Sequence, residues 1–336
     1  MFELLKKLCL ADATSGDETA VRDIIISEID GFCDWKIDNC GNILVEKKGK
    51  KRSVKRLMLD AHTDEVGLII SGVTAEGCLK FKTVGGIDTA VMAGRRVRIN
   101  GKLPGVIGIK PIHLLKGDDA KKLPKEDALY IDIGAADKDD ALKYVSLGDR
   151  AVILGEWIEN EEKILSKALD DRVGCAVLIK LLREASEYDF CASFSWGEEV
   201  GLRGAKTAAF ALNPQSAIVL EGTTAADIAS VSGAERVCEL SKGVVVSFMD
   251  RSTVYDREYY NRALSSGLLC QTKTAVSGGN DSGAIHLCRE GVRTIALSAP
   301  CRYIHSASSV VDKRDITAMY DMAKYMINGI CSGEIK

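Results

Sequence analysis

The sequence is poor in proline, histidine and aromatic residues. Its 336 residues include five prolines and four histidines, and 6% of them are aromatic. So few prolines leave little room for a Pro-rich linker, and neither a low-complexity segment nor an internal repeat is visible. The shortage of aromatic rings also disfavours a surface on which sugar rings stack. Because histidine is rare, each of its positions is a candidate for a chemical role.

Long apolar runs and paired cysteine motifs are missing as well. No stretch of 18 uncharged apolar residues occurs, so no membrane-spanning segment is expected. Residues 1–10 resemble the start of an amphipathic helix and are too short and too charged for a signal peptide. The eleven cysteines are odd in number, irregularly spaced and without Cys-x-x-Cys, and Cys175, Cys191 and Cys288 lie in apolar runs. The simplest compartment is therefore the reducing cytoplasm.

The charge of the chain is nearly balanced. The formal net charge is −3, with lysine and arginine scattered along the sequence, so a nucleic-acid surface is not expected. The one basic run, residues 47–52, lies between two strand-like segments and is predicted to form a solvated hairpin turn. An apolar content of 46% over this length can bury a large core and usually makes more than one domain.

Hydrophobic periodicity divides the chain into segments of two kinds. Residues 2–30 read as helical, whereas from residue 67 to about 161 short strands with frequent glycine are typical of a small β-barrel or sandwich. After residue 163, strands alternate with helices, which favours a mostly parallel sheet covered on both faces. We predict an α/β fold with a mixed, mostly parallel sheet flanked by helices, formed by residues 1–67 and 162–336, and an inserted β-rich domain at residues 68–161.

Acidic residues and histidines recur where the predicted strands end. A buried-looking strand at 57–60 leads to His62, and another at 191–196 runs into a pair of glutamates. In an open α/β sheet, ligands bind at the carboxyl ends of the strands, so these side chains are expected to lie together. The segments of this kind carry His62 and Asp64, Asp170 and Asp171, Glu198 and Glu199, Glu221, and His305.

Each of these segments alone has a simpler structural explanation. An isolated histidine is more often a hydrogen-bonded structural residue, Asp170 and Asp171 can cap the helix predicted after them, and a glutamate pair can begin a solvated helix. Structural roles do not account well for the same pattern at five strand ends. The repetition favours a metal site, in which Asp64 would hold the second ring nitrogen of His62.

The five segments also form a recognisable set of motifs. They are His62–Glu65, Ala168–Arg172, Glu198–Ala205, the strand-end acid Glu221, and Tyr303–Ser306, with further matching segments at residues 84–88, 105–115 and 278–286. On these motifs, which occur in the family's order, the chain resembles the M42 metallopeptidases. This family of di-metal aminopeptidases includes glutamyl aminopeptidase, tetrahedral aminopeptidase and proteins labelled endoglucanase M. The resemblance covers nearly the whole chain.

The resemblance implies a set of metal ligands. His62 and Glu221 would hold one metal ion, Glu199 and His305 would hold a second, and Asp170 would bridge the two. Many family members have aspartate in place of Glu221, and the longer arm of glutamate would alter metal choice or affinity there. Nitrogen and oxygen ligands without cysteine suit two divalent ions per subunit, either zinc, cobalt or manganese.

The resemblance implies catalytic roles as well. Glu198 would be the general base, Asp64 would orient His62, and Asp171 would support the bridging residue beside it. Water held between two cations about 3.5–4 Å apart would have its pKa lowered to about 7. Glu198 would take its proton and pass it to the leaving amine. The predicted reaction is the removal of the N-terminal residue from short peptides that have a free amino terminus.

Three other functions are kept open. A glycoside hydrolase also uses paired carboxylates, although it needs neither histidines nor metals. A non-catalytic homologue would keep metals for assembly or binding, although it would not require the spare carboxylate of Glu198. A related di-metal carboxypeptidase or deacylase would need a cation for the carboxylate of its substrate, and Arg302 is the candidate.

The substrate pocket is less clear from the sequence. Asp281, in the Gly-rich loop 278–283, is predicted to cap the helix through His286 near the substrate, and Arg302 and Asp281 are the predicted substrate-binding residues. His113 and His286 are predicted to be structural or supporting residues. Pocket walls are expected from residues 225–236 and 249–259.

The resemblance finally implies an assembly. In the family, the β-rich insert builds a dimer interface, and six dimers commonly close into a tetrahedral dodecamer with internal active sites. The expected partners are therefore short peptides and further copies of the chain, with neither nucleic acid nor membrane.

Overall fold

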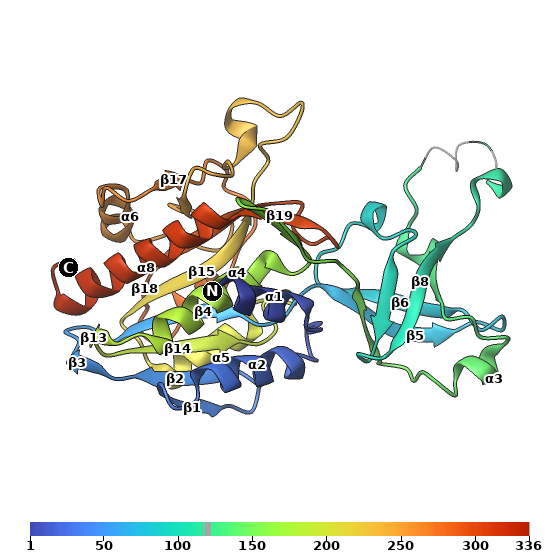
Figure 1. Ribbon diagram of the computed structural model, residues 1–336, viewed down its shortest axis with the longest axis horizontal. Coiled ribbons are helices and arrows are strands. Elements are labelled where there is room, and N and C mark those ends of the chain that lie inside the picture. Colours follow the sequence, from blue (N-terminus) through green and yellow to red (C-terminus); the bar gives the residue numbers. More distant parts are fainter. Residues whose placement is uncertain (116, 118–121, 336) are drawn as a thin grey trace.

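An eleven-stranded sheet forms one part of the molecule, and a separate β-barrel lies beside it (Figure 1). The structure is a computed structural model that describes residues 1–335 apart from 116 and 118–121. The sheet has the order β1-β2-β14-β4-β15-β18-β19-β12-β11, and β16 joins it beside β18 with β17 on its far side. The predicted α/β fold with an inserted β-barrel is confirmed.

Four parallel strands form the middle of the sheet, namely β14 (Phe190–Ser195), β4 (Leu57–His62), β15 (Ser216–Thr224) and β18 (Arg293–Arg302). Antiparallel pairings attach the outer strands to them, except that β17 pairs in parallel with β16. The outer strands are β1 (Asp34–Ile37), β2 (Ile43–Lys47), β11 (Ile158–Glu159), β12 (Lys163–Ser166), β16 (Val244–Val246), β17 (Cys270–Thr272) and β19 (Ser309–Asp312). Because the four middle strands run the same way, the residues that follow them meet at one edge.

The middle strands are buried on both faces, and their sequences are accordingly apolar. Along β4, Leu57 and Leu59 belong to the core on one face, and Met58 belongs to the core on the other. The polar residue Asp60 is also fully buried, and it accepts a hydrogen bond from the hydroxyl of Ser193 on β14. Polar side chains thus enter the interior only near the carboxyl end of the strand.

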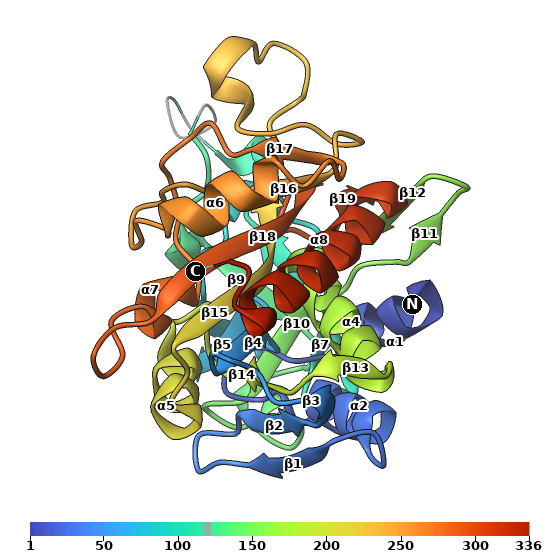
Figure 2. The ribbon, with the colours of Figure 1, turned by 90° about the vertical axis from the view of Figure 1, so that its left-hand side faces the viewer.

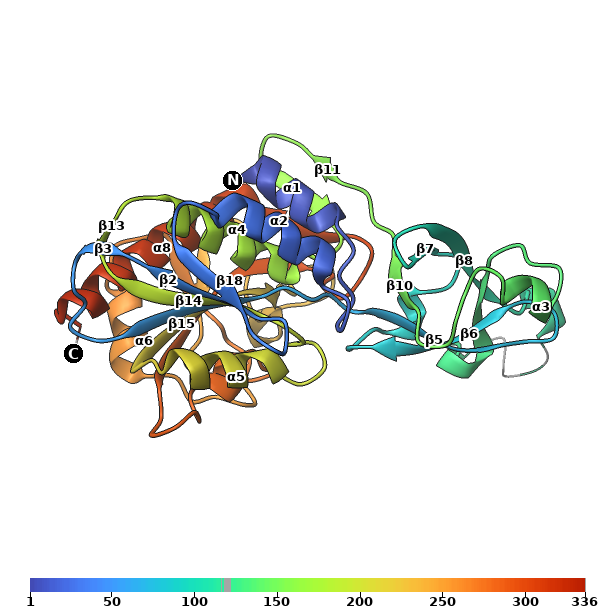
Figure 3. The same ribbon diagram turned by 90° about the horizontal axis from the view of Figure 1, so that it is seen from below.

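Helices cover both faces of the sheet (Figures 2 and 3). On one face α4 packs against β4 and β15, α8 packs against β18, and α1 and α2 lie against α4. The opposite face carries α5 and α7. The bounds are α1 (Phe2–Leu10), α2 (Thr19–Ile29), α4 (Leu169–Arg183), α5 (Arg203–Leu212), α6 (Arg257–Leu264), α7 (Ser282–Ile285) and α8 (Lys313–Ser332). None of the described helices is long and apolar enough to span a membrane.

The barrel is closed by six strands in the order β10-β5-β6-β9-β8-β7. Its apolar core, which includes Leu68, Leu79 and Ile131, is separate from the cores of the sheet. The elements are β5 (Gly67–Val73), β6 (Leu79–Val84), β7 (Arg96–Ile99), β8 (Leu103–Ile109), β9 (Leu129–Asp132), α3 (Lys138–Ala141) and β10 (Arg150–Ile153). The barrel follows β4 directly, so it is joined to the edge of the sheet at which His62 lies.

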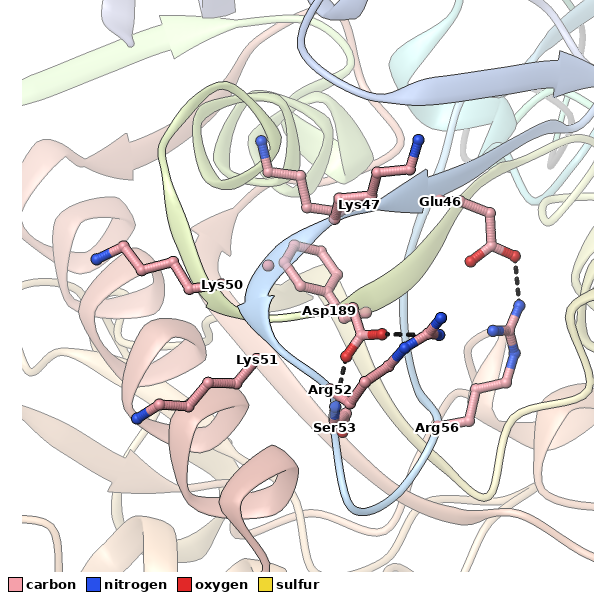
Figure 4. Close-up of a pocket in the computed structure, with 11 residues that line it drawn as sticks. Glu46, Lys47, Lys50, Lys51, Arg52, Ser53, Arg56 and Asp189 are labelled. Atoms are coloured by element: carbon pink, nitrogen blue, oxygen red, sulfur yellow. Dashed lines mark hydrogen bonds and ion pairs between the residues drawn. The ribbon is translucent and has the colours of Figure 1, made fainter.

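The basic run at residues 47–52 does not form the predicted hairpin turn. Its middle is the short strand β3 (Gly49–Lys51), which pairs in parallel with β13 (Ser186–Tyr188) (Figure 1). Figure 4 shows the basic side chains of this run, among which Arg52 contacts Asp189. Lys47 is buried, and its Nζ donates to the carbonyls of Phe32 and Leu182. The prediction of a hairpin turn was wrong because the partner strand lies far along the sequence and leaves no local signal, whereas Lys48 and residues 50–52 are exposed as predicted.

Candidate metal centre

The predicted metal ligands converge at the carboxyl edge of the sheet. His62 ends β4, Glu221 lies in β15, Glu199 follows β14, and His305 follows β18, while Asp170 lies at the start of α4. Distant parts of the sequence are therefore brought to one place by parallel strands, as the positions of these residues predicted.

Asp170 lies between the two histidines. Its Oδ1 is 3.5 Å from Nε2 of His62, and its Oδ2 is 3.6 Å from Nε2 of His305. Nε2 of His62 is also 3.7 Å from Oε2 of Glu221, and Nε2 of His305 is 3.3 Å from Oε1 of Glu199. Two ligand atoms about 2.1 Å from one cation at a tetrahedral angle lie about 3.4 Å apart. The spacings on both sides of Asp170 suit a divalent ion.

Three buried carboxylate oxygens give an independent test of this fit. Oδ1 of Asp170, Oδ2 of Asp171 and Oε1 of Glu221 are buried and have no hydrogen-bond partner among the described residues. Buried polar atoms are normally satisfied, and an acidic oxygen without a donor is costly. A cation among these oxygens would satisfy them, so the donor set fits divalent metals.

Each histidine is held through its other ring nitrogen. Nδ1 of His305 lies 2.8 Å from the carbonyl oxygen of Gly86, a residue that follows β6 of the barrel. Nδ1 of His62 lies 3.2 Å from the carbonyl oxygen and 3.3 Å from Oδ1 of Asp64. A carbonyl at Nδ1 favours the tautomer that leaves Nε2 free, as is usual for histidines that bind metals.

Asp64 also positions the two glutamates that follow β14. Its Oδ1 accepts the backbone N–H of Glu198 at 3.0 Å, and its Oδ2 accepts the backbone N–H of Glu199 at 3.1 Å. Oδ2 further accepts the hydroxyl of Ser15 at 2.6 Å. Together these bonds lower the pKa of the fully buried Asp64, with the neighbouring His62 as the main favourable influence against burial. The carboxylate of Asp64, which was predicted to orient His62, thus contacts His62 and also holds the backbone of Glu198 and Glu199.

The acidic groups of the site are strongly perturbed. Burial raises the pKa of Glu198 to about 8, with His62 opposing the shift and Glu199 adding to it. Burial likewise raises the pKa values of Asp171 and Glu221 well above their usual range. Such crowding of carboxylates is costly without cations and is typical of functional sites.

The acidic pair at the start of α4 departs from simple helix capping. Asp171 does accept the backbone N–H of Gly174 at 2.9 Å, as a capping residue would. Asp170 and Asp171 nevertheless have non-helical backbone angles, and a cis peptide bond joins them. Oxygen and nitrogen atoms of His62, Asp171 and Glu221 form one possible ligand group, and those of Asp170, Glu199 and His305 form another. Sequence reasoning gave Asp171 only a supporting role.

A buried ion cluster fixes the segment that follows His62. Glu65 accepts two hydrogen bonds from Nζ of Lys167, at 2.7 and 2.8 Å, and one from the backbone N–H of Ala13 at 3.1 Å, and it lies 3.4 Å from Nη2 of Arg172. Arg172 is fully buried and donates further to the carbonyls of Leu8, Thr63 and Asp64. Because a broken buried pair costs far more than an exposed one, this cluster holds the loop rigidly.

The metal centre opens into a cavity of about 750 Å³. Its walls include Thr223, Arg251, Ser252, Lys273 and Ile304 in addition to the predicted ligands. Residues 249–259 were expected to form a wall, and Arg251 and Ser252 do so. Lys273 was not anticipated, because nothing in its local sequence marks it as a cavity residue.

The two predicted substrate-binding residues have other partners. Arg302 forms two hydrogen bonds to the carboxylate of Asp227, at 2.8 and 2.6 Å, and it is not among the residues that line this cavity. Asp281 precedes α7, as predicted, but its side chain does not cap that helix. It is fully buried and accepts a hydrogen bond from the hydroxyl of Ser195 at 2.5 Å. Neither predicted substrate-binding residue therefore lines the cavity.

Comparison with known proteins identifies the family. The family model described as M42 glutamyl aminopeptidase matches residues 41–322. The chain belongs to the M42 peptidase family. The resemblance drawn from the motifs is therefore confirmed, and the protein is a hydrolase that acts on peptide bonds.

Relatives of the M42 family resemble the chain over its whole length. A protein of Acetivibrio thermocellus is 35% identical over 338 residues, which is 98% of both chains. A lysyl aminopeptidase of Pyrococcus furiosus is 29% identical and covers 97% of this chain and 96% of its own. The structure of a TET peptidase of Pyrococcus horikoshii, which can assemble into a tetrahedron or an octahedral shell, has a TM-score of 0.85 at 34% identity, covering 96% of this chain and 98% of that one.

Proposed function

We propose that the protein is a di-metal aminopeptidase that removes the N-terminal residue from short peptides, with Glu198 as the general base. The observation that carries this proposal is the position of Asp170, whose two oxygens face His62 on one side and His305 on the other. The ions would be held by His62, Asp170, Glu199, Glu221 and His305. When bound, two divalent cations would supply Lewis acidity, which polarises the scissile carbonyl and makes water easier to deprotonate.

Glu198 is suited to proton transfer by its position. It lines the cavity, and its backbone is held by Asp64. Burial raises the pKa of its carboxyl group, and cations bound beside it would lower that pKa again and favour the ionised form that accepts a proton. Its side chain would accept the proton of the attacking water and deliver it to the nitrogen of the leaving peptide. The acidic surroundings would also attract the α-ammonium group of the substrate.

The proposal predicts that hydrolysis requires a free amino terminus. Protein stripped of metal and reloaded with zinc, cobalt or manganese is expected to release p-nitroaniline from aminoacyl-p-nitroanilides and not from their N-acetylated forms. Short peptides should lose residues one by one from the amino end, as mass spectrometry would show. Cleavage of the acetylated substrates would instead favour a deacylase, and release from the carboxyl end would favour a carboxypeptidase.

We further propose that the chain assembles into dimers through the barrel, the β-rich dimerisation domain at residues 68–161, and into a dodecamer of six dimers. The support is the family and the shell-forming TET relative. Multi-angle light scattering of metal-loaded protein is expected to give twelve times the chain mass of 36.3 kDa. A monomer mass at every metal level would rule the assembly out.

We also propose a cytoplasmic location. All eleven cysteines are free, and seven of them are buried rather than paired. A reducing compartment suits such a chain, because disulfides form and persist in oxidising ones.

A further inference from the structure

We propose that Ser15 is a positioning residue of the metal centre and that it transmits the position of the barrel to Asp64. This inference rests on the proposed di-metal function and adds to it a residue from the amino-terminal part of the chain. Residues 11–18 form the linking segment between α1 and α2, in a region that was predicted to be helical throughout. The sequence marks no residue of this segment as part of the site.

The linking segment lies against the residues that follow β4. Thr14 and Glu65 form a parallel β-bridge, in which the N–H of Glu65 donates to the carbonyl of Ala13 at 2.8 Å. The N–H of Ser15 donates to the carbonyl of Glu65 at 3.3 Å. This bridge brings the hydroxyl of Ser15 to Oδ2 of Asp64, to which it donates at 2.6 Å. Both residues are buried, and a hydrogen bond shielded from water is the stronger for it.

Three parts of the site meet at the carboxylate of Asp64. Its Oδ1 faces Nδ1 of His62 and accepts the N–H of Glu198, and its Oδ2 accepts the N–H of Glu199. Among the described residues, Ser15 is the only one whose hydroxyl donates to this carboxylate. Removing the hydroxyl leaves Oδ2 with one bond and lets the carboxylate turn. The groups that it aligns would then be held less firmly, which lowers metal affinity.

Two contacts from the barrel hold the linking segment in place. Arg98 on β7 donates two hydrogen bonds to the carboxylate of Asp12, both at 2.6 Å, a geometry that fixes direction as well as distance. Nε of Arg150 on β10 donates to the carbonyl of Ser15 at 3.3 Å. Gly16 permits this approach, because its φ is +92° and a Cβ there would lie 2.9 Å from Nη2 of Arg150. Ser15 therefore takes its position from the barrel.

The barrel consequently acts on both halves of the metal centre. The carbonyl of Gly86 holds His305, and the linking segment holds His62 through Ser15 and Asp64. One histidine of each proposed ion is thus oriented from the barrel. Contacts of the barrel that lie away from the ions should therefore change metal affinity, and bound metal should in turn strengthen those contacts.

Replacement of Ser15 tests the first step. Calorimetric titration of metal-free Ser15→Ala with zinc or cobalt is expected to show a Kd about 10- to 100-fold weaker than that of the wild type. At saturating metal, turnover should fall in kcat and not in KM, because Ser15 does not line the cavity. Ser15→Thr keeps the hydroxyl and should restore most of the affinity. Ser27→Ala, at an exposed serine on α2, is the matched control.

Two arginines of one strand test the link to the barrel. Arg98→Gln removes the pair with Asp12 and should weaken metal binding in the same direction as Ser15→Ala, with little further loss when the two changes are combined. Arg96→Gln is the control, since Arg96 also lies on β7 but pairs with the exposed Glu156 outside the linking segment. Its metal affinity should equal that of the wild type.

A double-mutant cycle with Asp64→Ala separates positioning from a general loss of stability. In that background Ser15→Ala should weaken metal binding no further, because the hydroxyl acts through Asp64. A further loss as large as in the wild-type background would overturn the inference. Wild-type metal affinity in a folded Ser15→Ala protein would overturn it as well. If Ser15→Ala does not fold, Arg98→Gln carries the test, because its change lies at a partly exposed pair away from the ions.

The inference and the proposed function fail in different ways. If the variants change metal affinity as expected but no aminoacyl substrate is cleaved with any metal, the proposed function falls and the role of Ser15 stands. If peptides are cleaved while Ser15→Ala and Arg98→Gln bind metal as the wild type does, the role of Ser15 falls and the aminopeptidase stands. A wild-type protein that binds no divalent metal would overturn both.

Discussion

Replacing Glu198 by glutamine is expected to lower kcat about 10²- to 10⁴-fold while the bound metal stays at the wild-type amount. Glutamine has nearly the same shape, and the backbone N–H of residue 198 would still donate to Oδ1 of Asp64. The side-chain amide, however, does not accept a proton from water near neutral pH. The substitution therefore removes the proposed proton transfer and leaves the architecture of the site in place.

Steady-state kinetics on an aminoacyl-p-nitroanilide with a free amino group measure kcat. Mass spectrometry of the same protein measures the amount of bound metal. The control is Glu290→Gln, which makes the same chemical change at an exposed residue beyond α7. Turnover equal to wild type in the Glu198 variant would show that another group is the base. Loss of metal would instead make Glu198 a ligand, an arrangement that its grouping with His62 and Glu199 also allows.

Removal of the metal ions is expected to abolish turnover and to lower the melting temperature. Without cations, buried oxygens of Asp170, Asp171 and Glu221 lack hydrogen-bond donors, and burial raises the pKa values of Glu199 and Glu221. Binding to the folded state alone stabilises it by about 2.7 kcal/mol per site when the free ion is at 100 times its Kd. Chelation should therefore reduce stability by a few kcal/mol, and zinc, cobalt or manganese should restore both stability and turnover.

This prediction is tested by measuring the melting temperature and the turnover before chelation, after chelation and after the metal is restored. Asp170→Asn is the informative variant, because it weakens the residue that faces both histidines and should therefore lose most of the metal-dependent rise in melting temperature. The control variant Lys206→Gln, at an exposed lysine on α5 outside the cavity, should keep the full metal-dependent rise in melting temperature. Full turnover after complete chelation would contradict the metal-dependent mechanism and would favour a two-carboxylate hydrolase.

The middle of the fold and the convergence of the proposed metal ligands at one edge of the sheet were predictable from the sequence. Apolar runs such as 57–60 and 191–196 form buried parallel strands, and they can be read locally because burial on both faces requires continuous apolar residues. The ligands follow because a polar residue directly after such a strand has few structural reasons to be there. The shift to short, glycine-rich strands likewise marked the barrel.

Features that depend on contacts between distant residues were not predictable. The pairing of Arg302 with Asp227 and the bond from Ser195 to Asp281 join residues 75 and 86 positions apart. The parallel pairing of β3 with β13 is equally remote. A charged residue looks the same in the sequence whether it pairs with an acid or lines a cavity, so Arg302 and Arg251 could not be told apart. Their different surroundings appear only in the folded chain.

The bond between His305 and the carbonyl of Gly86 has a consequence for synthesis of the protein. These residues are 219 positions apart, so a ribosome that adds about 5–20 residues per second makes the second about 10–45 s after the first. For about the last two thirds of that interval, all six barrel strands, whose partners lie between residues 67 and 153, have already been synthesised. His62 and its neighbouring acids meanwhile lack most of their partners. The barrel can therefore pair all of its strands before His305, the last of the proposed metal ligands, is made.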